Sequence, residues 1–109
     1  MPKRDDDLLI TDILNCCINI EEYIASATFE EFVNDKKTVD AVVRNFEIIG
    51  EASKLISEEV KFANPLIEWR MMTDFRNILI HDYFGIDYEV LWQSVKENIP
   101  YNYELLKRI

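Results

Sequence analysis

Three side chains that can act on a phosphate group lie close together near residue 80. Arg76, His81 and Tyr83 fall within eight residues, and His81 is the only histidine in the protein. Histidine titrates near neutral pH and moves protons in both directions, whereas arginine stays charged and matches phosphate oxygens with a planar fork of donors. His81 could take the proton from a ribose 2′-hydroxyl or protonate a leaving oxygen, while Arg76 stabilises the charge that develops around phosphorus. This residue set indicates a phosphate-directed site whose chemistry needs no metal and no cofactor.

Helical geometry limits how these groups can meet. On one continuous helix Arg76 and His81 point roughly 140° apart, whereas Asn77 and His81, at a spacing of four, are neighbours. Arg76, His81 and Tyr83 converge more easily if the helix ends near His81 and Gly85 helps to turn the chain. A position at a helix C-terminus also favours the protonated form of histidine.

His81 has a second interpretation, because an isolated histidine after an apolar helix can be a surface or helix-capping residue. The spacing R-x4-H-x-Y by itself occurs by chance. One arginine and one histidine also make a sparse active site. Two copies of the chain related by a two-fold axis could instead line one cleft with both sets of residues.

Chain length and amino-acid composition predict one all-α domain that spans residues 1–109. A chain of 109 residues is enough for one core, and 49% hydrophobic with 30% charged residues is typical of a globular protein. Two glycines and three prolines leave little room for tight turns, so long helices are expected. No apolar run approaches the roughly 18 residues that a membrane span needs, and the acidic start lacks a signal-peptide core, so a cytoplasmic location is expected.

Charge and cysteine content restrict the partners. A net charge of −9 argues against a broad basic face that coats nucleic acid, DNA included, although it permits a small local basic pocket. An acidic surface also suits a basic partner protein. Cys16 and Cys17 are adjacent and are expected to be reduced, apolar fillers on a helix. With one histidine and two adjacent thiols the sequence offers no metal-ligand spacing.

Hydrophobic periodicity predicts an up-and-down bundle of four main helices plus short ones. The spacing of three and four over residues 5–27 predicts the first helix, with Asp5, Asp6 and Asp7 at the positive end of its dipole. Thr28 and Glu31 match a capping box for a short helix to about residue 34. The remaining helices are expected over residues 38–60, over residues 68–80, and from a cap at Asp87 to the C-terminus, with a kink or restart at Pro100.

Small residues interrupt the apolar stripe of the longest expected helix. Gly50 and Ser53 lie among valines, isoleucines and Phe46 on that stripe. They would let another helix approach closely, which offsets the helix-propensity cost of an interior glycine. The stripe is expected to be core, or in part a dimer interface.

The sequence resembles the HEPN domains of the HepT-like toxin family. Residues 76–83 resemble that family's R-x4-6-H-x-Y signature, and the likeness continues through Gly85 and Asp87. Residues 37–52 look like its long-helix motif, residues 67–70 resemble its approach to the site, and residues 28–32 also fit. The resemblance covers about residues 8–100. Asp74 departs from the pattern, because it stands where the family usually has glycine, and it is expected to pair with Arg70 or to cap the helix.

The resemblance implies a metal-independent ribonuclease toxin of a type II/VII-like toxin–antitoxin pair. The implied catalytic residues are Arg76 and His81, acting on RNA in a cleft shared by a homodimer. The implied partner is an MntA-type nucleotidyltransferase antitoxin that neutralises the toxin by adenylylating Tyr83, so that the added AMP blocks RNA by bulk and negative charge. Neither a membrane nor DNA is an implied partner.

Several polar residues have two open roles. Asn77, Tyr83, Arg44 and Asn45 are candidates for binding or supporting the RNA phosphate. Arg44, Asn45 and Glu51 could equally serve as surface pairs or interhelical hydrogen bonds. A non-catalytic HEPN module that binds a nucleotidyltransferase, a nucleotide or another protein is the alternative function. The net charge of −9 favours that alternative, and the intact Arg76, His81 and Tyr83 set favours the enzyme.

Overall fold

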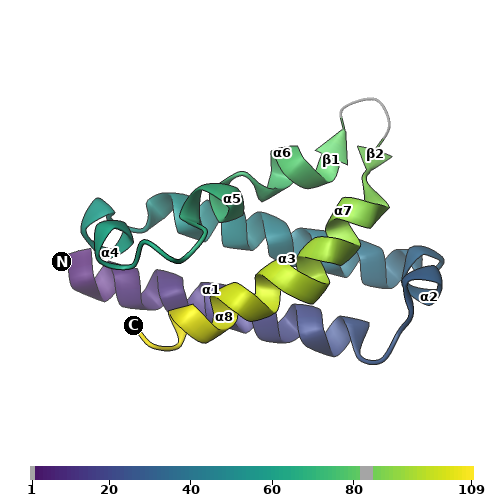
Figure 1. The fold of residues 1–109 in the computed structure, drawn as a ribbon, viewed down its shortest axis with the longest axis horizontal. Helices are drawn as coiled ribbons and strands as arrows, with labels where there is room; N and C mark the ends of the chain where they lie inside the picture. Colours follow the sequence, from purple (N-terminus) through teal and green to yellow (C-terminus); the bar gives the residue numbers. More distant parts are fainter. Residues whose placement is uncertain (1, 82–84) are drawn as a thin grey trace.

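Two long antiparallel helices, α1 (Pro2–Ile24) and α3 (Lys36–Leu55), form one half of the bundle in the computed structural model (Figure 1). The structure describes the backbone of residues 2–81 and 85–109, and the side chains of residues 5–80 and 85–109. The short helix α2 (Phe29–Val33) joins α1 to α3. Its N-cap is the predicted capping box, since the Thr28 hydroxyl accepts from the Glu31 N–H at 3.1 Å and the Glu31 carboxylate accepts from the Thr28 N–H at 2.8 Å.

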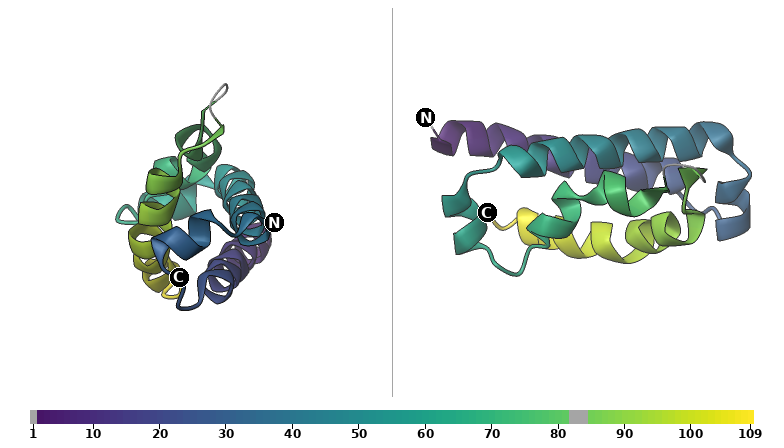
Figure 2. Two further views of the ribbon diagram at one scale, coloured as in Figure 1. Left: turned by 90° about the vertical axis from the view of Figure 1, so that its right-hand side faces the viewer. Right: turned by 90° about the horizontal axis from the view of Figure 1, so that it is seen from above.

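The second half of the bundle returns along the first. Helices α4 (Glu58–Ala63), α5 (Trp69–Thr73) and α6 (Phe75–Leu79) lead to a hairpin of β1 (Ile80–His81) and β2 (Gly85–Ile86). From there α7 (Tyr88–Gln93), the π-helical segment η1 (Ser94–Asn98) and α8 (Ile99–Leu106) run back to the C-terminus. The chain therefore passes along the long axis in alternating directions (Figure 2), and the prediction of an all-α, up-and-down bundle is confirmed.

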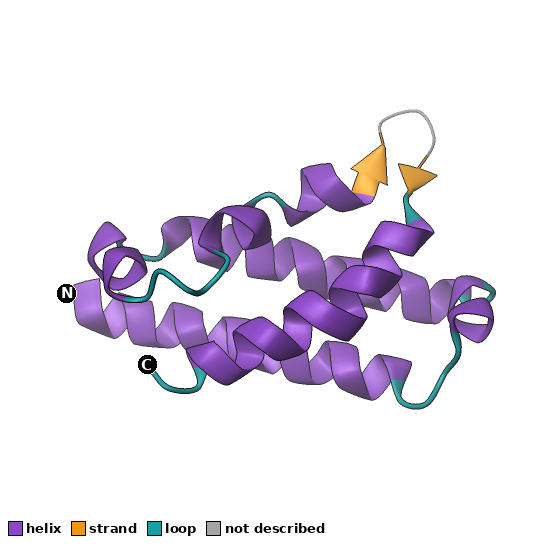
Figure 3. Ribbon diagram, viewed as in Figure 1, coloured by secondary structure: helices purple, strands orange, loops and turns teal. Residues whose placement is uncertain are grey.

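Two of the expected long helices are each broken once. The helix expected over residues 38–60 stops at Leu55, because Ile56 is extended and Ser57 caps a separate α4 by accepting from the Val60 N–H. The helix expected over residues 68–80 is divided at Asp74, which lies between α5 and α6. It also ends one residue early, since Ile80 enters the hairpin that Figure 3 shows at one end of the bundle.

The core lies between the two halves. Ile13, Ile20 and Ile24 lie on one side of α1 and are buried, as the helical periodicity predicts. Cys16 and Cys17 are also buried in this core. Phe46 of α3 meets Phe75 of α6 edge to face, with ring centroids 4.7 Å apart. This aromatic contact fixes α6, and with it the start of the hairpin, against the middle of α3.

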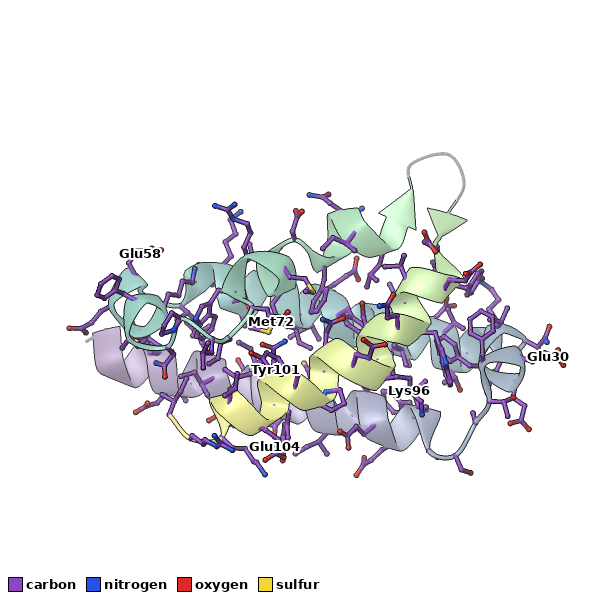
Figure 4. All side chains as sticks on the ribbon, in the orientation of Figure 1. Glu30, Glu58, Met72, Lys96, Tyr101 and Glu104 are labelled. Atoms are coloured by element: carbon purple, nitrogen blue, oxygen red, sulfur yellow. The ribbon has the colours of Figure 1, made fainter. Side chains whose placement is uncertain are left out.

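Gly50 brings the two halves into close contact, as predicted for a small residue on the α3 stripe. A Cβ atom at this position would lie 3.3 Å from the carbonyl oxygens of both Met72 and Thr73 at the end of α5. Met72 is itself buried inside the bundle (Figure 4). The absence of a side chain at Gly50 therefore lets the backbone of α5 lie against α3, one turn away from Glu47.

Asp6 has a different role from the one expected of it. Asp5 remains in the first turn of α1, where a carboxylate suits the helix dipole. Asp6 is instead 3% exposed and accepts hydrogen bonds from the N–H of Ser57 at 2.9 Å and from its hydroxyl at 2.7 Å. This carboxylate ties α1 to the N-terminus of α4 across 51 residues of sequence.

Candidate functional site

The end of α6 and the hairpin position the Arg76–His81 segment. Helix α6 ends at Leu79, and Ile80 and His81 then pair in antiparallel fashion with Ile86 and Gly85. The N–H of Asp87 donates to the carbonyl of Leu79 at 2.8 Å, which closes the base of the hairpin. Gly85 has a φ of 78°, a conformation that glycine adopts without strain. The expected helix end near His81 and the expected turn at Gly85 are thus confirmed.

Two of the predicted groups fall outside the described part of the chain. The backbone of His81 belongs to β1, but its imidazole is not among the described side chains, and Tyr83 lies between the described residues 81 and 85. The catalytic role of His81 and the acceptor role of Tyr83 therefore remain predictions.

Arg76 is described, and a second arginine from another helix lies near it. The Arg76 guanidinium on α6 is 4.0 Å from one carboxylate oxygen of Glu47 on α3. The Arg44 guanidinium, also on α3, is 3.9 Å from the other oxygen of the same carboxylate. The two arginine side chains are 73% and 71% exposed, whereas that of Glu47 is 30% exposed. One partly buried carboxylate therefore joins two solvent-facing cations.

These three residues surround a small cavity between α3 and the α5–α6 segment. The cavity measures about 170 Å³, and Gly50, Glu51 and Thr73 complete its lining. Glu51 makes no ion pair within the described residues. The cavity lining therefore combines two guanidinium groups, donors that match the oxygens of a phosphate, with the two carboxylates of Glu47 and Glu51.

Asn77 is exposed beside Arg76 but is already hydrogen bonded. Its amide donates to the carboxylate of Asp74 at 2.6 Å. Asp74 occupies the N-cap position of α6, although its side chain makes no hydrogen bond to the helix backbone. No ion pair with Arg70 is found among the described side chains, so neither expected role of Asp74 is realised. Asp74 instead orients Asn77, which keeps a carboxylate close to the candidate site.

Asn45 lies away from this cavity. Its side chain is buried, with the amide donating to the Ala41 carbonyl at 2.8 Å and its oxygen accepting from Asn19 of α1 at 3.2 Å. Both of its polar groups are thus occupied, the amide within α3 and the oxygen by a hydrogen bond from α1. The structure favours the interhelical hydrogen bond over a role in binding RNA, whereas Arg44 on the neighbouring face of α3 does reach the site.

The residue that sequence reasoning missed is Glu47. It lies three positions after Arg44 and three before Gly50, a spacing that places all of them on adjacent parts of one helix face. That spacing could have indicated a pair with Arg44. The contact with Arg76 depends on the close approach of α5–α6 to α3 and could not be seen from the sequence.

No group of three or more potential metal ligands from His, Cys, Asp and Glu occurs in the described ranges. Among the helices as far as they are described, none is long and apolar enough to cross a membrane.

Comparison with known proteins places the chain in a family. A family model described as Ribonuclease HepT-like matches residues 13–109. A "probable ribonuclease HepT" of Thermococcus cleftensis is 49% identical over 98 residues, covering 90% of this chain and 89% of the relative. A "putative RNase" of Methanocaldococcus jannaschii is 44% identical over 100 residues, covering 92% of each chain. One from Caldanaerobacter subterraneus is 36% identical over 97 residues, covering 89% of this chain and 84% of the relative. No solved structure matches.

Proposed function

Because the chain belongs to the HepT-like ribonuclease family, we propose that it cleaves RNA and that Arg76 and His81 carry out the cleavage. The observation that carries this proposal is the pair of arginines around one cavity, at the foot of the hairpin that contains His81. It places two guanidinium groups at one point of a chain whose net charge is −9, where they balance the carboxylates of Glu47 and Glu51 in the same lining. RNA would therefore be held at this point rather than over a broad surface.

The proposed reaction uses proton transfer and charge stabilisation alone. His81 takes the proton of a ribose 2′-hydroxyl as that oxygen attacks the adjacent phosphorus, or returns a proton to the leaving oxygen. Arg76 donates hydrogen bonds to the phosphate oxygens, where negative charge accumulates in the transition state. Arg44 supplies the second cation at the same phosphate. The reaction as proposed requires no metal ion.

We further propose that the protein is the toxin of a toxin–antitoxin pair and that it acts as a homodimer. Two copies of the hairpin would line one cleft and double its cationic groups. The partner would be a nucleotidyltransferase antitoxin that transfers AMP to the Tyr83 hydroxyl. An AMP group two residues from His81 would bring negative charge and bulk to the phosphate site and prevent RNA from binding.

Cleavage of a fluorescent RNA in the presence of EDTA tests the central proposal. We expect the wild type to cut, and Arg76→Ala and His81→Ala each to lower kcat/KM by about 10²- to 10⁴-fold. Arg108→Ala is the matched control, because it removes an exposed arginine near the C-terminus, away from the cavity. RNA that stays equally intact with all four proteins would favour the non-catalytic alternative, in which the domain binds a nucleotidyltransferase. Activity lost in EDTA and restored by a divalent cation would contradict the metal-free reaction.

Co-expression with the nucleotidyltransferase tests the regulatory proposal. We expect mass increments of AMP on the wild-type chain and none on Tyr83→Phe. Increments that persist in Tyr83→Phe would show that another residue is the acceptor.

A further inference from the structure

The contact between Glu47 and two arginines presents a physical puzzle. A carboxylate in a phosphate site should repel the RNA substrate. Glu47 nevertheless lies between Arg44 and Arg76, the two cations that would bind the RNA phosphate. Its ion pairs are long, at 3.9 Å and 4.0 Å, and both arginines face solvent. Exposed pairs of this kind contribute little to folding stability. Stability therefore does not explain why this carboxylate lies here.

The positions of the two arginines offer an explanation. Arg44 comes from α3 and Arg76 from α6, so two like charges from separate helices line one small cavity. Two guanidinium groups so placed repel each other, and each long side chain has many rotamers in water. A carboxylate that forms an ion pair with one guanidinium at each of its oxygens opposes both effects. The oxygens of Glu47 contact the arginines in this divided way, Oε1 with Arg44 and Oε2 with Arg76.

Glu47 is also held more firmly than the groups it contacts. Its side chain is 30% exposed, and it projects from α3, a continuous helix of 20 residues. The neighbouring Gly50 brings α5 against this part of α3, which is what allows Arg76 to come within range. The carboxylate is thus a fixed point on the rigid half of the bundle, whereas Arg76 lies on a five-residue helix next to the hairpin.

We propose that Glu47 is a positioning residue for RNA cleavage, whose carboxylate holds the Arg76 and Arg44 guanidinium groups side by side and ready for one phosphate. This inference rests on the proposed ribonuclease function. Glu47 does not touch the reacting atoms in this scheme. It acts through Arg76, and it accepts some electrostatic repulsion of RNA in exchange for a prearranged pair of donors.

If Glu47 positions the arginines, its replacement should change kcat and KM for RNA in different ways. Glu47→Gln keeps the size of the side chain and raises the local charge by one unit. We expect KM for RNA to fall, because the site becomes more positive. We expect kcat to fall roughly 3- to 10-fold, since Arg76 must then be immobilised during the reaction. A purely structural role would lower the amount of active enzyme and would not lower KM.

Asp40→Asn provides the matched control. Asp40 lies on the same helix α3 and is paired with Lys36 at 3.6 Å, so this variant also removes one carboxylate and one exposed ion pair. Asp40 does not line the cavity. We expect its kcat and KM to equal those of the wild type. Glu47→Asp, which keeps the charge but shortens the reach, should retain the KM of the wild type and lose part of kcat.

A double-mutant cycle shows whether Glu47 acts through Arg76. Arg76→Ala removes the guanidinium that lies against Oε2 of Glu47, so adding Glu47→Gln to it should lower kcat by a smaller factor than in the wild type. Equal effects of Glu47→Gln in both backgrounds, or an unchanged kcat in a wild type that cleaves RNA, would overturn the role of Glu47 alone. A wild type that cleaves no RNA would overturn the ribonuclease proposal, and the role of Glu47 with it.

Discussion

At the residue scale, burial in the core opposes ionisation of the Cys17 thiol. Its side chain is 1% exposed, and burial, followed by the neighbouring Cys16 and Glu21, raises the pKa of its thiol to about 12. The unfolded thiol titrates near pH ~8.5. The neutral thiol thus gives a contribution to stability that is complete below that value and is lost as the pH rises toward 12.

We predict that Cys17→Ala reduces the alkaline loss of stability. Between pH 8 and pH 11 the wild type should lose about 2–3 kcal/mol more in its free energy of unfolding than Cys17→Ala, because only its unfolded chain ionises at this position. Urea unfolding at the two pH values measures the difference. Iodoacetamide at pH 8 should leave both cysteines of the native protein unmodified and should modify both in urea. Rapid alkylation of the native protein would contradict the deep burial of the thiol.

Glu47 and Asn45 show which site residues a sequence can and cannot identify. Arg76 and His81 could be proposed from residue type and spacing, because their chemistry is distinctive and they are close in sequence, and their catalytic roles remain predictions. Asn45 looked equally polar but is used between α1 and α3. Glu47 gave no signal, since a glutamate on a helix is common and its second arginine lies 29 positions away. Only the packing of the helices in the folded protein shows that Glu47 contacts Arg76 and that Asn45 does not face the cavity.

At the scale of elements, the close packing of α5 against α3 at Gly50 positions Arg76 beside Glu47. We predict that Gly50→Ala lowers the free energy of unfolding, although alanine favours a helix over glycine by about 1 kcal/mol. The new methyl group would lie 3.3 Å from two backbone carbonyl oxygens, and such overpacking costs about 1–3 kcal/mol. Displacement of α5–α6 should also move Arg76 away from Glu47 and so lower RNA cleavage.

Chemical denaturation measures the stability of Gly50→Ala, and an RNA cleavage assay measures its activity. A variant more stable than the wild type would contradict the prediction, because it would mean that α5 moves to accept the methyl group at little cost.

The link between α1 and α4 gives a second prediction at this scale. Asp6→Ala should cost about 1–3 kcal/mol, because it leaves the partly buried N–H and hydroxyl of Ser57 without their acceptor. Asp7→Ala is the control, since Asp7 is an exposed neighbour on the same helix turn and should change stability by less than about 0.5 kcal/mol. Thermal unfolding of both variants distinguishes the loss of the Asp6–Ser57 hydrogen bonds from the general effect of losing one carboxylate. Equal changes in the two variants would contradict the role of Asp6 in linking α1 to α4.

Helix positions were predictable to the extent that they depend on local sequence. The capping box at Thr28, the cap at Asp87 and the restart near Pro100 are confirmed, because each depends on residues within one or two turns. The breaks at Ser57 and Asp74 were missed. Ser57 begins a new helix partly through Asp6, which is 51 residues away, and the hairpin depends on the pairing of Ile80 with Ile86. Such long-range contacts leave no periodic pattern in the sequence.

Charge distribution decides at the molecular scale where RNA can bind. The net charge is −9, and acidic side chains such as Glu30, Glu58 and Glu104 point outward at separate places on the bundle (Figure 4). A polyanion is repelled by most of this surface, so the proposed site depends on the arginines at the cavity for its attraction to RNA. One protomer contributes two such arginines, Arg44 and Arg76, in a lining that also holds Glu47 and Glu51. A second protomer would double the cationic groups available to the same RNA strand.

Mixed dimers test whether two protomers share one cleft. We predict that a heterodimer of an Arg76→Ala chain and a His81→Ala chain, purified through different tags, cleaves RNA at up to about half the wild-type rate. Its cleft would hold one intact Arg76 and one intact His81, whereas each mutant homodimer lacks one of these groups and should be inactive. Light scattering of the wild type at micromolar concentration should give the mass of a dimer. A monomeric wild type, or a heterodimer as inactive as its parent homodimers, would mean that each chain must use its own Arg76 and His81 together.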